Sequence, residues 1–241
     1  MRDDVPETPT RQALAVCSTR AVGPYTLLHV ARGGVDPGSP GQFFMLTPPG
    51  HLLPRPMSLC IAPPGRLGFL IDPIGPGTRA LCSLRPGERL HVLGPLGKGF
   101  SLDGARPLLV GGGIGVAPLP YLSEALGSPP ALLGFRSASH AQAAALVPNA
   151  EVVLEPAYVT ERLPAPELGF DVLACGPEPM LDAVRRLAPT AQLACEAPMA
   201  CGYGACHGCA VEIDGELRRL CVEGPVLRAR PESVRSERRV A

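Results

Sequence analysis

The sequence predicts a protein of class α/β plus all-β, built from two larger units and a small cysteine-rich module. Short strand-like runs separated by Pro and Gly clusters in the first part of the chain predict an antiparallel β-barrel. Apolar strands that alternate with helices in the middle predict a doubly wound parallel sheet. A dense group of cysteines follows. We expect the three units to span residues 1–104, 105–190 and 191–241.

The strands expected in the barrel are short and are bounded by turn residues. The chain has 28 glycines and 30 prolines, and because they are scattered among apolar runs they indicate turns rather than disorder. The strands predicted for this unit span residues 25–32, 42–47, 55–60, 67–72 and 89–93.

The middle of the chain changes to an alternation of strands and helices. The strands predicted there span residues 107–111, 131–135, 151–155 and 170–175, and the predicted helices lie at 117–126, near residue 141 and at 178–187. Alternation of this kind forms a parallel sheet with right-handed crossovers. In the last unit, predicted strands at 210–213 and 217–221 flank the pair Asp214 and Gly215, which is a strong hairpin signal.

The composition excludes several classes of function. The 22 basic residues are balanced by 22 acidic ones, so the sequence predicts no basic surface for nucleic acid. The longest apolar run, 107–119, is too short and too rich in glycine to span a membrane. The first ten residues lack the apolar core of a signal peptide, so we expect a cytoplasmic protein whose nine cysteines serve as thiols and metal ligands.

Four of these cysteines have the spacing C-x4-C-x2-C-x11-C, which is typical of a plant-type [2Fe-2S] cluster. They are Cys201, Cys206, Cys209 and Cys221. The glycines between them permit tight turns and leave backbone N–H groups free to point at sulfur. A structural zinc site is the alternative, although zinc usually takes two C-x2-C pairs rather than one. His207 lies inside the loop, but four cysteines complete the ligand set without it.

Two glycine-containing turns in the middle unit predict a dinucleotide site. The first follows a strand and contains Gly111, Gly112, Gly113 and Gly115. The second contains Cys175 and Gly176 and also joins a strand to a helix. Both lie at the carboxyl ends of parallel strands, where doubly wound sheets bind their ligands and bare amides face a diphosphate. A purely structural turn, and a buried Cys175 with no role, remain the alternatives.

Two short motifs in the first unit suit a second nucleotide. RPMS supplies a cation, a rigid proline and a hydroxyl on one strand, and GPGT supplies an open backbone and a hydroxyl. A cluster carries one electron at a time and a nicotinamide exchanges two as hydride, so a flavin is expected between them. The first unit is the part of the chain left for it.

In this order, the motifs RPMS, GPGT, GPLGKGF, GGGIGVAPL, CGPEPM and MACGYGACHGC resemble the electron-transfer subunits of NAD-dependent (type B) dihydroorotate dehydrogenases. These are ferredoxin-reductase-like flavoproteins. The resemblance covers nearly the whole chain and implies an FAD-binding barrel, an NAD-binding domain and a C-terminal [2Fe-2S] module. It implies FAD contacts at Arg55, Pro56, Met57, Ser58, Gly77 and Thr78, with Leu70, Ile71 and Asp72 on the strand beside it, and the four cysteines as cluster ligands.

The resemblance further implies an oxidoreductase subunit without a catalytic acid or base. Electrons would come from the FMN of a catalytic partner subunit and reach NAD+ through the cluster and FAD, in pyrimidine (UMP) biosynthesis, within a heterotetramer of two subunits of each kind. Two features depart from the family. Ile71 and Asp72 stand where an aromatic and a basic residue are expected, and the loop between Leu154 and Tyr158 is short.

Other assignments remain open at this point. The same cofactors occur in the flavin and iron-sulfur subunits of ferredoxin-NADP+ reductase, sulfide dehydrogenase and hydrogenase complexes. The residues MACG around Cys201 favour the dihydroorotate dehydrogenase family over these. A zinc-binding scaffold without redox function is a further alternative.

Overall fold

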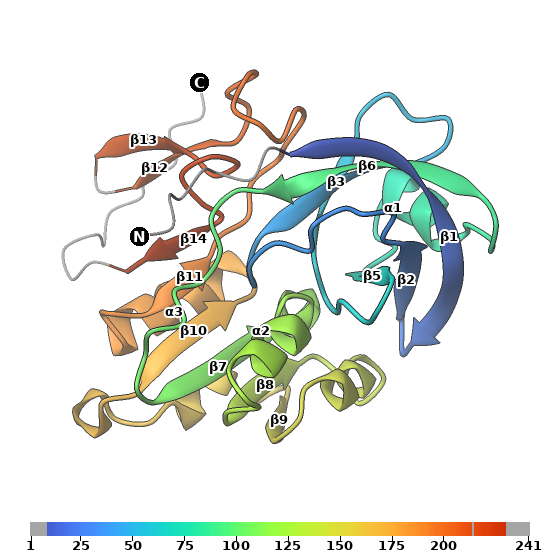
Figure 1. Ribbon diagram of the computed structural model, residues 1–241. Helices are drawn as coiled ribbons and strands as arrows, with labels where there is room; N and C mark the ends of the chain where they lie inside the picture. Colours follow the sequence, from blue (N-terminus) through green and yellow to red (C-terminus); the bar gives the residue numbers. More distant parts are fainter. Residues whose placement is uncertain (1–8, 214, 230–241) are drawn as a thin grey trace.

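Two six-stranded sheets and a two-stranded hairpin make up the computed structural model, which describes residues 9–213 and 215–229 (Figure 1). The first sheet lies at the right of Figure 1, the second runs along the lower left, and the hairpin lies at the upper left. The predicted fold class is confirmed: an antiparallel β unit is followed by an α/β unit and a small cysteine-containing module. No helix in these residues is long and apolar enough to cross a bilayer.

The first sheet is antiparallel throughout, in the order β4-β3-β6-β1-β2-β5. Its strands are β1 (Thr10–Val22), β2 (Tyr25–Ala31), β3 (Phe43–Thr47), β4 (Arg55–Ser58), β5 (Arg66–Ile71) and β6 (Arg89–Leu96). A β-bridge between Ile61, just after β4, and Gly68 of β5 joins the two end strands and closes the barrel. Fully buried side chains such as Phe44, Leu28 and Phe69 fill its interior.

Two elements of this unit differ from the sequence prediction. Strand β1 is not among the predicted strands, because its apolar residues are mixed with polar ones and a bulge between Val16 and Ser18 interrupts the alternation. The motif GPGT is the start of helix α1 (Pro76–Cys82), in a unit for which the sequence predicted strands alone. Pro76 is suited to this first helical position because no backbone N–H is needed there.

The second sheet has the order β14-β11-β10-β7-β8-β9, and only β14 is antiparallel to its neighbour. Its strands are β7 (Pro107–Gly112), β8 (Ala131–Phe135), β9 (Ala150–Leu154), β10 (Asp171–Cys175), β11 (Gln192–Ala194) and β14 (Val226–Arg228). The chain runs outward from β7 through β8 to β9 and then crosses to β10 and β11. The strand order therefore reverses between β7 and β10, which is where sheets of this kind bind ligands.

The helices of this unit are short. They are α2 (Leu119–Ala125), α3 (Glu178–Leu187) and 3-10 helices at Gly113–Val116, His140–Leu146, Val159–Arg162 and Pro166–Leu168. The predicted helix at 178–187 is confirmed, whereas the one predicted at 117–126 begins later, at Leu119. The helix predicted near residue 141 is a 3-10 helix.

The hairpin after the second sheet consists of β12 (Ala210–Ile213) and β13 (Glu216–Arg219). Ile213 pairs with Glu216, as the hairpin prediction requires, while Asp214 of the predicted turn lies outside the described residues. Strand β13 ends before Cys221, so this cysteine follows the strand instead of closing it. Strands β11 and β14, from the segment predicted as the third unit, both extend the second sheet. The unit boundaries stay a prediction.

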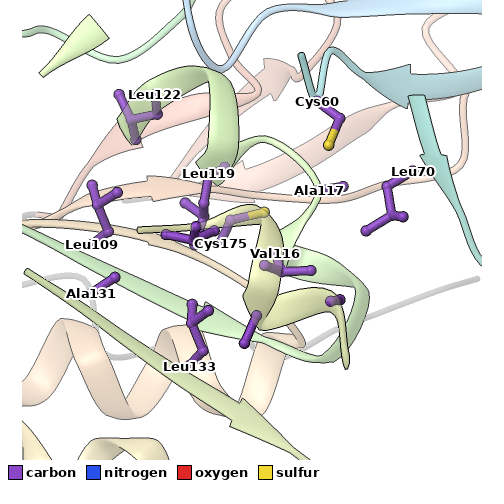
Figure 2. Close-up of a cluster of buried hydrophobic side chains, with 14 of the residues drawn as sticks. Cys60, Leu70, Leu109, Val116, Ala117, Leu119, Leu122, Ala131, Leu133 and Cys175 are labelled. Atoms are coloured by element: carbon purple, nitrogen blue, oxygen red, sulfur yellow. The ribbon is translucent and has the colours of Figure 1, made fainter. Parts of the chain in front are cut away.

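Shared apolar cores hold the three units together. Cys60 and Leu70 of the barrel pack with Val116 and Ala117 of the second unit, as Figure 2 shows. A second shared core joins the barrel to the cysteine module through a set of buried residues: Phe43, Met45, Leu96, Cys209, Leu220 and Cys221. The cysteine module is therefore fixed to the barrel wall through its own candidate ligands.

Candidate cofactor sites

The structure brings the four cysteines of the predicted cluster into one loop system. Cys201 and Cys206 lie on the loop that follows β11, Cys209 directly precedes β12, and Cys221 follows β13. Leu220 N donates to the Cys209 carbonyl oxygen at 3.1 Å, which places the ends of β12 and β13 side by side. As a result the sulfurs of Cys209 and Cys221 are 3.2 Å apart.

Each of the four sulfurs accepts a backbone hydrogen bond. The donors are the amides of Cys206 to Cys201 (3.4 Å), Gly208 to Cys206 (3.4 Å), Cys221 to Cys209 (3.5 Å) and Gly204 to Cys221 (3.1 Å). Such bonds stabilise thiolates relative to thiols. Burial raises the pKa of Cys201, but hydrogen bonds from the backbone around it and from Cys206 outweigh this and lower that pKa to about 6. At Cys201 the loop therefore favours the anionic form that a metal requires.

The ligands form one exposed and one buried pair. Cys206 is exposed and Cys201 half-buried, whereas Cys209 and Cys221 are buried against the barrel. Burial, and then the neighbouring Cys209 thiol, raise the pKa of Cys221 to about 12. In the described part of the chain, no three candidate ligands surround a single ion position. Pairs of cysteines suit a two-iron cluster, in which each iron takes two protein ligands, better than a four-cysteine zinc site.

The glycines of the loop are required by close approach. Gly202 has a φ of +81°, and a Cβ there would lie 2.8 Å from Met45 Sδ of the barrel strand β3. Any larger side chain would therefore separate the loop from the barrel. His207 is exposed and has a φ of +57°.

A cavity of about 640 Å³ lies at the carboxyl ends of β7, β8 and β10, at the point where the strand order reverses. Gly112 and Gly113 line it, but Gly111 and Gly115 do not. A Cβ on Gly111 would lie 2.7 Å from Leu119 Cδ1, and one on Gly115 would lie 2.5 Å from the Gly176 Cα. Two of the four predicted glycines thus face the cavity, and two allow the strand, the 3-10 helix and the second turn to pack closely.

The two residues of the second predicted turn, Cys175 and Gly176, do not line the cavity. Gly176 and Gly112 both abut Met180 of α3, because a Cβ on Gly112 would lie 2.5 Å and one on Gly176 3.0 Å from Met180 Sδ. The Cys175 thiol lies in the apolar core beside Val116 and Leu119 (Figure 2). Burial raises the pKa of this thiol far above its ordinary value, so it is neutral. The structure places it behind the cavity wall.

The two barrel motifs are brought together. The Arg55 guanidinium lies against Gly77, where a Cβ would be 2.5 Å from Arg55 Nε. Its Nη1 donates to the carbonyl oxygens of Leu53 at 2.9 Å and Pro54 at 3.2 Å, which fixes its direction. The Thr78 hydroxyl is engaged with Gly75 at the start of α1, at 3.0 and 3.1 Å. RPMS and GPGT are separated by 16 residues along the chain, and the contact between Arg55 and Gly77 brings the two motifs together.

The side chains of the neighbouring strand β5 are divided between two cores. Ile71 is fully buried inside the barrel, and Leu70 is buried in the core shared with the second unit. Only their backbone is left to contact a ligand. Asp72 follows the strand and lines the 640 Å³ cavity, so it faces the nucleotide side of the molecule.

Comparison with known proteins assigns the chain to a family. Residues 196–231 match the model of the iron-sulfur cluster binding domain of dihydroorotate dehydrogenase B. The chain is 36% identical to the electron transfer subunit of dihydroorotate dehydrogenase B (NAD(+)) from Geobacillus thermodenitrificans, over 91% of this chain and 97% of the relative. It belongs to this family. The subunit from Clostridium perfringens is 32% identical over 77% of this chain and 83% of the relative.

Solved structures of lower identity share the fold of this dihydroorotate dehydrogenase B family member. The NADH-dependent reduced ferredoxin-NADP oxidoreductase superposes with a TM-score of 0.76 at 22% identity, covering 90% of this chain and 88% of that one. Phthalate dioxygenase reductase superposes with a TM-score of 0.62 at 14% identity, covering 85% and 87%. Both confirm the ferredoxin-reductase-like architecture.

Sequence reasoning missed a polar group on the cavity wall of this family member. Arg136, at the end of β8, donates from Nε to His140 Nε2 at 2.8 Å. Because Nε2 accepts, the proton of a neutral His140 is on Nδ1, which contacts Ser137 Oγ at 2.8 Å. The His140 ring packs edge-on against Tyr25 of the barrel, 5.6 Å between centroids. Only Arg136 was visible in the sequence, as a cation directly after a strand.

Proposed function

We propose that this chain is the electron transfer subunit of an NAD-dependent dihydroorotate dehydrogenase B and holds a [2Fe-2S] cluster, FAD and NAD. The observation that carries the proposal is the four-cysteine loop, in which each sulfur accepts a backbone hydrogen bond and which packs directly on the barrel. When bound, the cluster carries single electrons and the flavin exchanges them with the hydride of the nicotinamide. The residues of the chain bind and orient these groups.

The cluster ligands in this proposal are Cys201, Cys206, Cys209 and Cys221. The backbone amides around them lower the cost of holding four thiolates, and the buried pair lies against Met45. Met45 of β3 is paired with Pro56 of RPMS on the adjacent strand β4. The cluster and the proposed flavin site are therefore separated by adjacent strands of one sheet.

For FAD, we propose that Arg55 and the backbone of Gly77 bind the diphosphate. The guanidinium is already fixed beside Gly77 by its hydrogen bonds to the Leu53 and Pro54 carbonyl oxygens, and a charge-assisted pair with phosphate needs such a fixed direction. Thr78 adds a hydroxyl next to it. The remaining proposed contacts are Pro56, Met57 and Ser58 by side chain, Leu70 and Ile71 by backbone, and Asp72 at the end of the strand.

For NAD, we propose the 640 Å³ cavity. Gly112 and Gly113 bring bare backbone to the diphosphate, and Arg136, directed by His140, offers two unoccupied Nη donors among the described residues. Gly111, Gly115, Cys175 and Gly176 shape the site from behind through close packing. Asp72 follows β5, the strand proposed to lie beside the flavin, and it lines this cavity. We propose that the nicotinamide and flavin rings meet near Asp72, because hydride transfer requires the two rings to be in contact.

The partner we propose is a catalytic subunit that contains FMN, in a heterotetramer of two subunits of each kind, acting in pyrimidine (UMP) biosynthesis. The family name supports a separate catalytic subunit. A loop that holds four unpaired thiols is stable in a reducing compartment, which supports a cytoplasmic location.

The direct test of the cofactor set is the colour and metal content of the purified chain. We expect two irons and one FAD per chain, with visible absorption from both cofactors. The reason is that the loop offers two pairs of cysteine ligands and that we propose one FAD site on the barrel, at Arg55 and Gly77. A colourless protein that contains one zinc per chain would contradict the proposal and support the zinc scaffold.

Arg55→Ala is expected to weaken FAD binding about ten- to hundred-fold, which corresponds to the loss of about 1.5 to 3 kcal/mol for a hydrogen bond to a charged group. The measurement is FAD retention after dilution, followed by titration of the apoprotein. Arg79→Ala is the matched control. Arg79 is an exposed arginine on helix α1, which also carries Gly77 and Thr78, and its Nη1 donates to the Ile74 carbonyl at 3.1 Å. Equal affinity in the two variants would show that Arg55 does not bind the diphosphate.

A further inference from the structure

A single ion pair holds the cluster loop from the side of the hairpin. Arg219, the last residue of β13, donates from Nη1 to the Gly204 carbonyl oxygen at 3.2 Å and from Nη2 to Glu223 Oε1 at 3.1 Å. The other carboxylate oxygen of Glu223 accepts the Arg219 backbone N–H at 2.6 Å. The guanidinium is thus fixed between the carboxylate and the loop.

The loop residue that Arg219 contacts is also a donor to a candidate ligand. Gly204 has a φ of +89°, and its N–H donates to Cys221 Sγ at 3.1 Å. A Cβ on Gly204 would lie 2.8 Å from Val222 Cγ2, so a larger residue does not fit at this position. The contact of Arg219 with the Gly204 carbonyl therefore fixes the amide that faces the sulfur.

Arg219 also supplies a charge that the loop lacks. Residues 195–213 contain two glutamates and no lysine or arginine. With the thiolates of Cys201, Cys206 and Cys209 added, this segment is strongly negative, and an added electron is then costly. Arg218, the neighbouring arginine, pairs instead with Glu216 at 2.9 Å on the exposed hairpin. Among the residues that the structure describes, Arg219 is the cation that hydrogen-bonds to the loop.

We infer that Arg219 is a positioning residue that raises the reduction potential of the cluster, and that Glu223 tempers this effect. The inference rests on the proposed cluster site. A guanidinium beside the loop favours the reduced, more negative form, and the Gly204 amide that it fixes does the same at Cys221. The carboxylate of Glu223 opposes both by partly neutralising the guanidinium. The ion pair would thereby set how readily electrons enter the subunit.

The test is a redox titration of the cluster in the purified, FAD-containing chain, read from its electron paramagnetic resonance signal. Arg219→Gln is expected to shift the potential to more negative values, with two irons per chain retained. Arg219→Lys is expected to recover part of the shift, because it restores the charge but not the forked contact. Arg218→Gln is the matched control and is expected to leave the potential unchanged. A wild-type potential in Arg219→Gln would overturn the inference.

Glu223→Gln keeps the test decisive if Arg219→Gln loses its iron. This variant retains the guanidinium and removes the opposing charge, so the potential is expected to shift to more positive values. An unchanged or more negative potential would overturn the inference whatever Arg219→Gln does. The iron content of the unmodified chain distinguishes failure of the proposed cluster site from failure of the inference about Arg219. Absence of iron in the unmodified chain contradicts the cluster site, whereas iron without these shifts contradicts only the role of Arg219.

Discussion

Cys209→Ser is expected to abolish the iron-sulfur absorption of the chain while leaving its FAD bound. Cys209 is 2% exposed and its sulfur lies 3.2 Å from that of Cys221, so the variant removes a sulfur from the buried pair of candidate ligands. The flavin is retained because the core that fills the barrel is distinct from the core that Cys209 joins. The measurements are iron per chain, the visible spectrum and flavin fluorescence after denaturation.

The matched control for this variant is Cys195→Ser. Cys195 is half-buried just before the loop, and its thiol contacts the Leu193 carbonyl oxygen at 3.7 Å rather than a candidate ligand. This change is expected to leave the iron content unaltered. Two irons per chain in Cys209→Ser would show that the ligand set is wrong, and loss of FAD from the same variant would show that the two sites are not independent.

The parts of this molecule that sequence alone predicts are those that depend on local chemistry. The spacing of the four cysteines follows from the reach of one short loop, and the strand-to-helix turns follow from glycine and proline. The fold class was predictable for the same reason, since alternating strands and helices have few ways to form a parallel sheet.

The parts that were not predicted depend on contacts between distant segments. Strands β11 and β14 are three residues each, too short to carry a periodic signal, and they are defined by pairing with the sheet. The position of Met45 against Gly202 joins residues more than 150 positions apart. The opposite directions of Leu70 and Ile71 follow from the pleat of β5, and the sequence does not reveal which face meets the second unit.

The loop after β9 is shorter than the family pattern, and the structure shows that it still lines the cavity. Glu155 and Tyr158 stand on this loop and both line the cavity, opposite Arg136. The loop is anchored by the Glu155 N–H, which donates to the Phe135 carbonyl oxygen at 3.1 Å. A shorter loop therefore leaves a formed pocket, whose wall includes two carboxylates, Asp72 and Glu155, and one guanidinium, Arg136.

The division of the reaction between two subunits gives the largest expected effect. NADH is expected to bleach the flavin absorbance of the isolated chain and to support reduction of a small artificial acceptor, because Asp72, at the end of the strand β5 that is proposed to lie beside the flavin, also lines the cavity. Dihydroorotate alone is expected to cause no change. The described residues that line the cavity include no cysteine or serine, so no such side chain there can take a proton from that substrate.

Adding the FMN-containing catalytic subunit is expected to turn this inactive mixture into one that makes NADH from dihydroorotate and NAD+. The Cys209→Ser variant, tested beside Cys195→Ser, is expected to keep its reaction with NADH and the artificial acceptor but to lose the coupled reaction. The reason is structural: the exposed Cys206 and the half-buried Cys201 face outward, while Cys209 and Cys221 face the barrel, so the loop lies between the surface and the flavin site. Oxidation of dihydroorotate by the isolated chain, or an unchanged coupled rate in Cys209→Ser, would contradict this route.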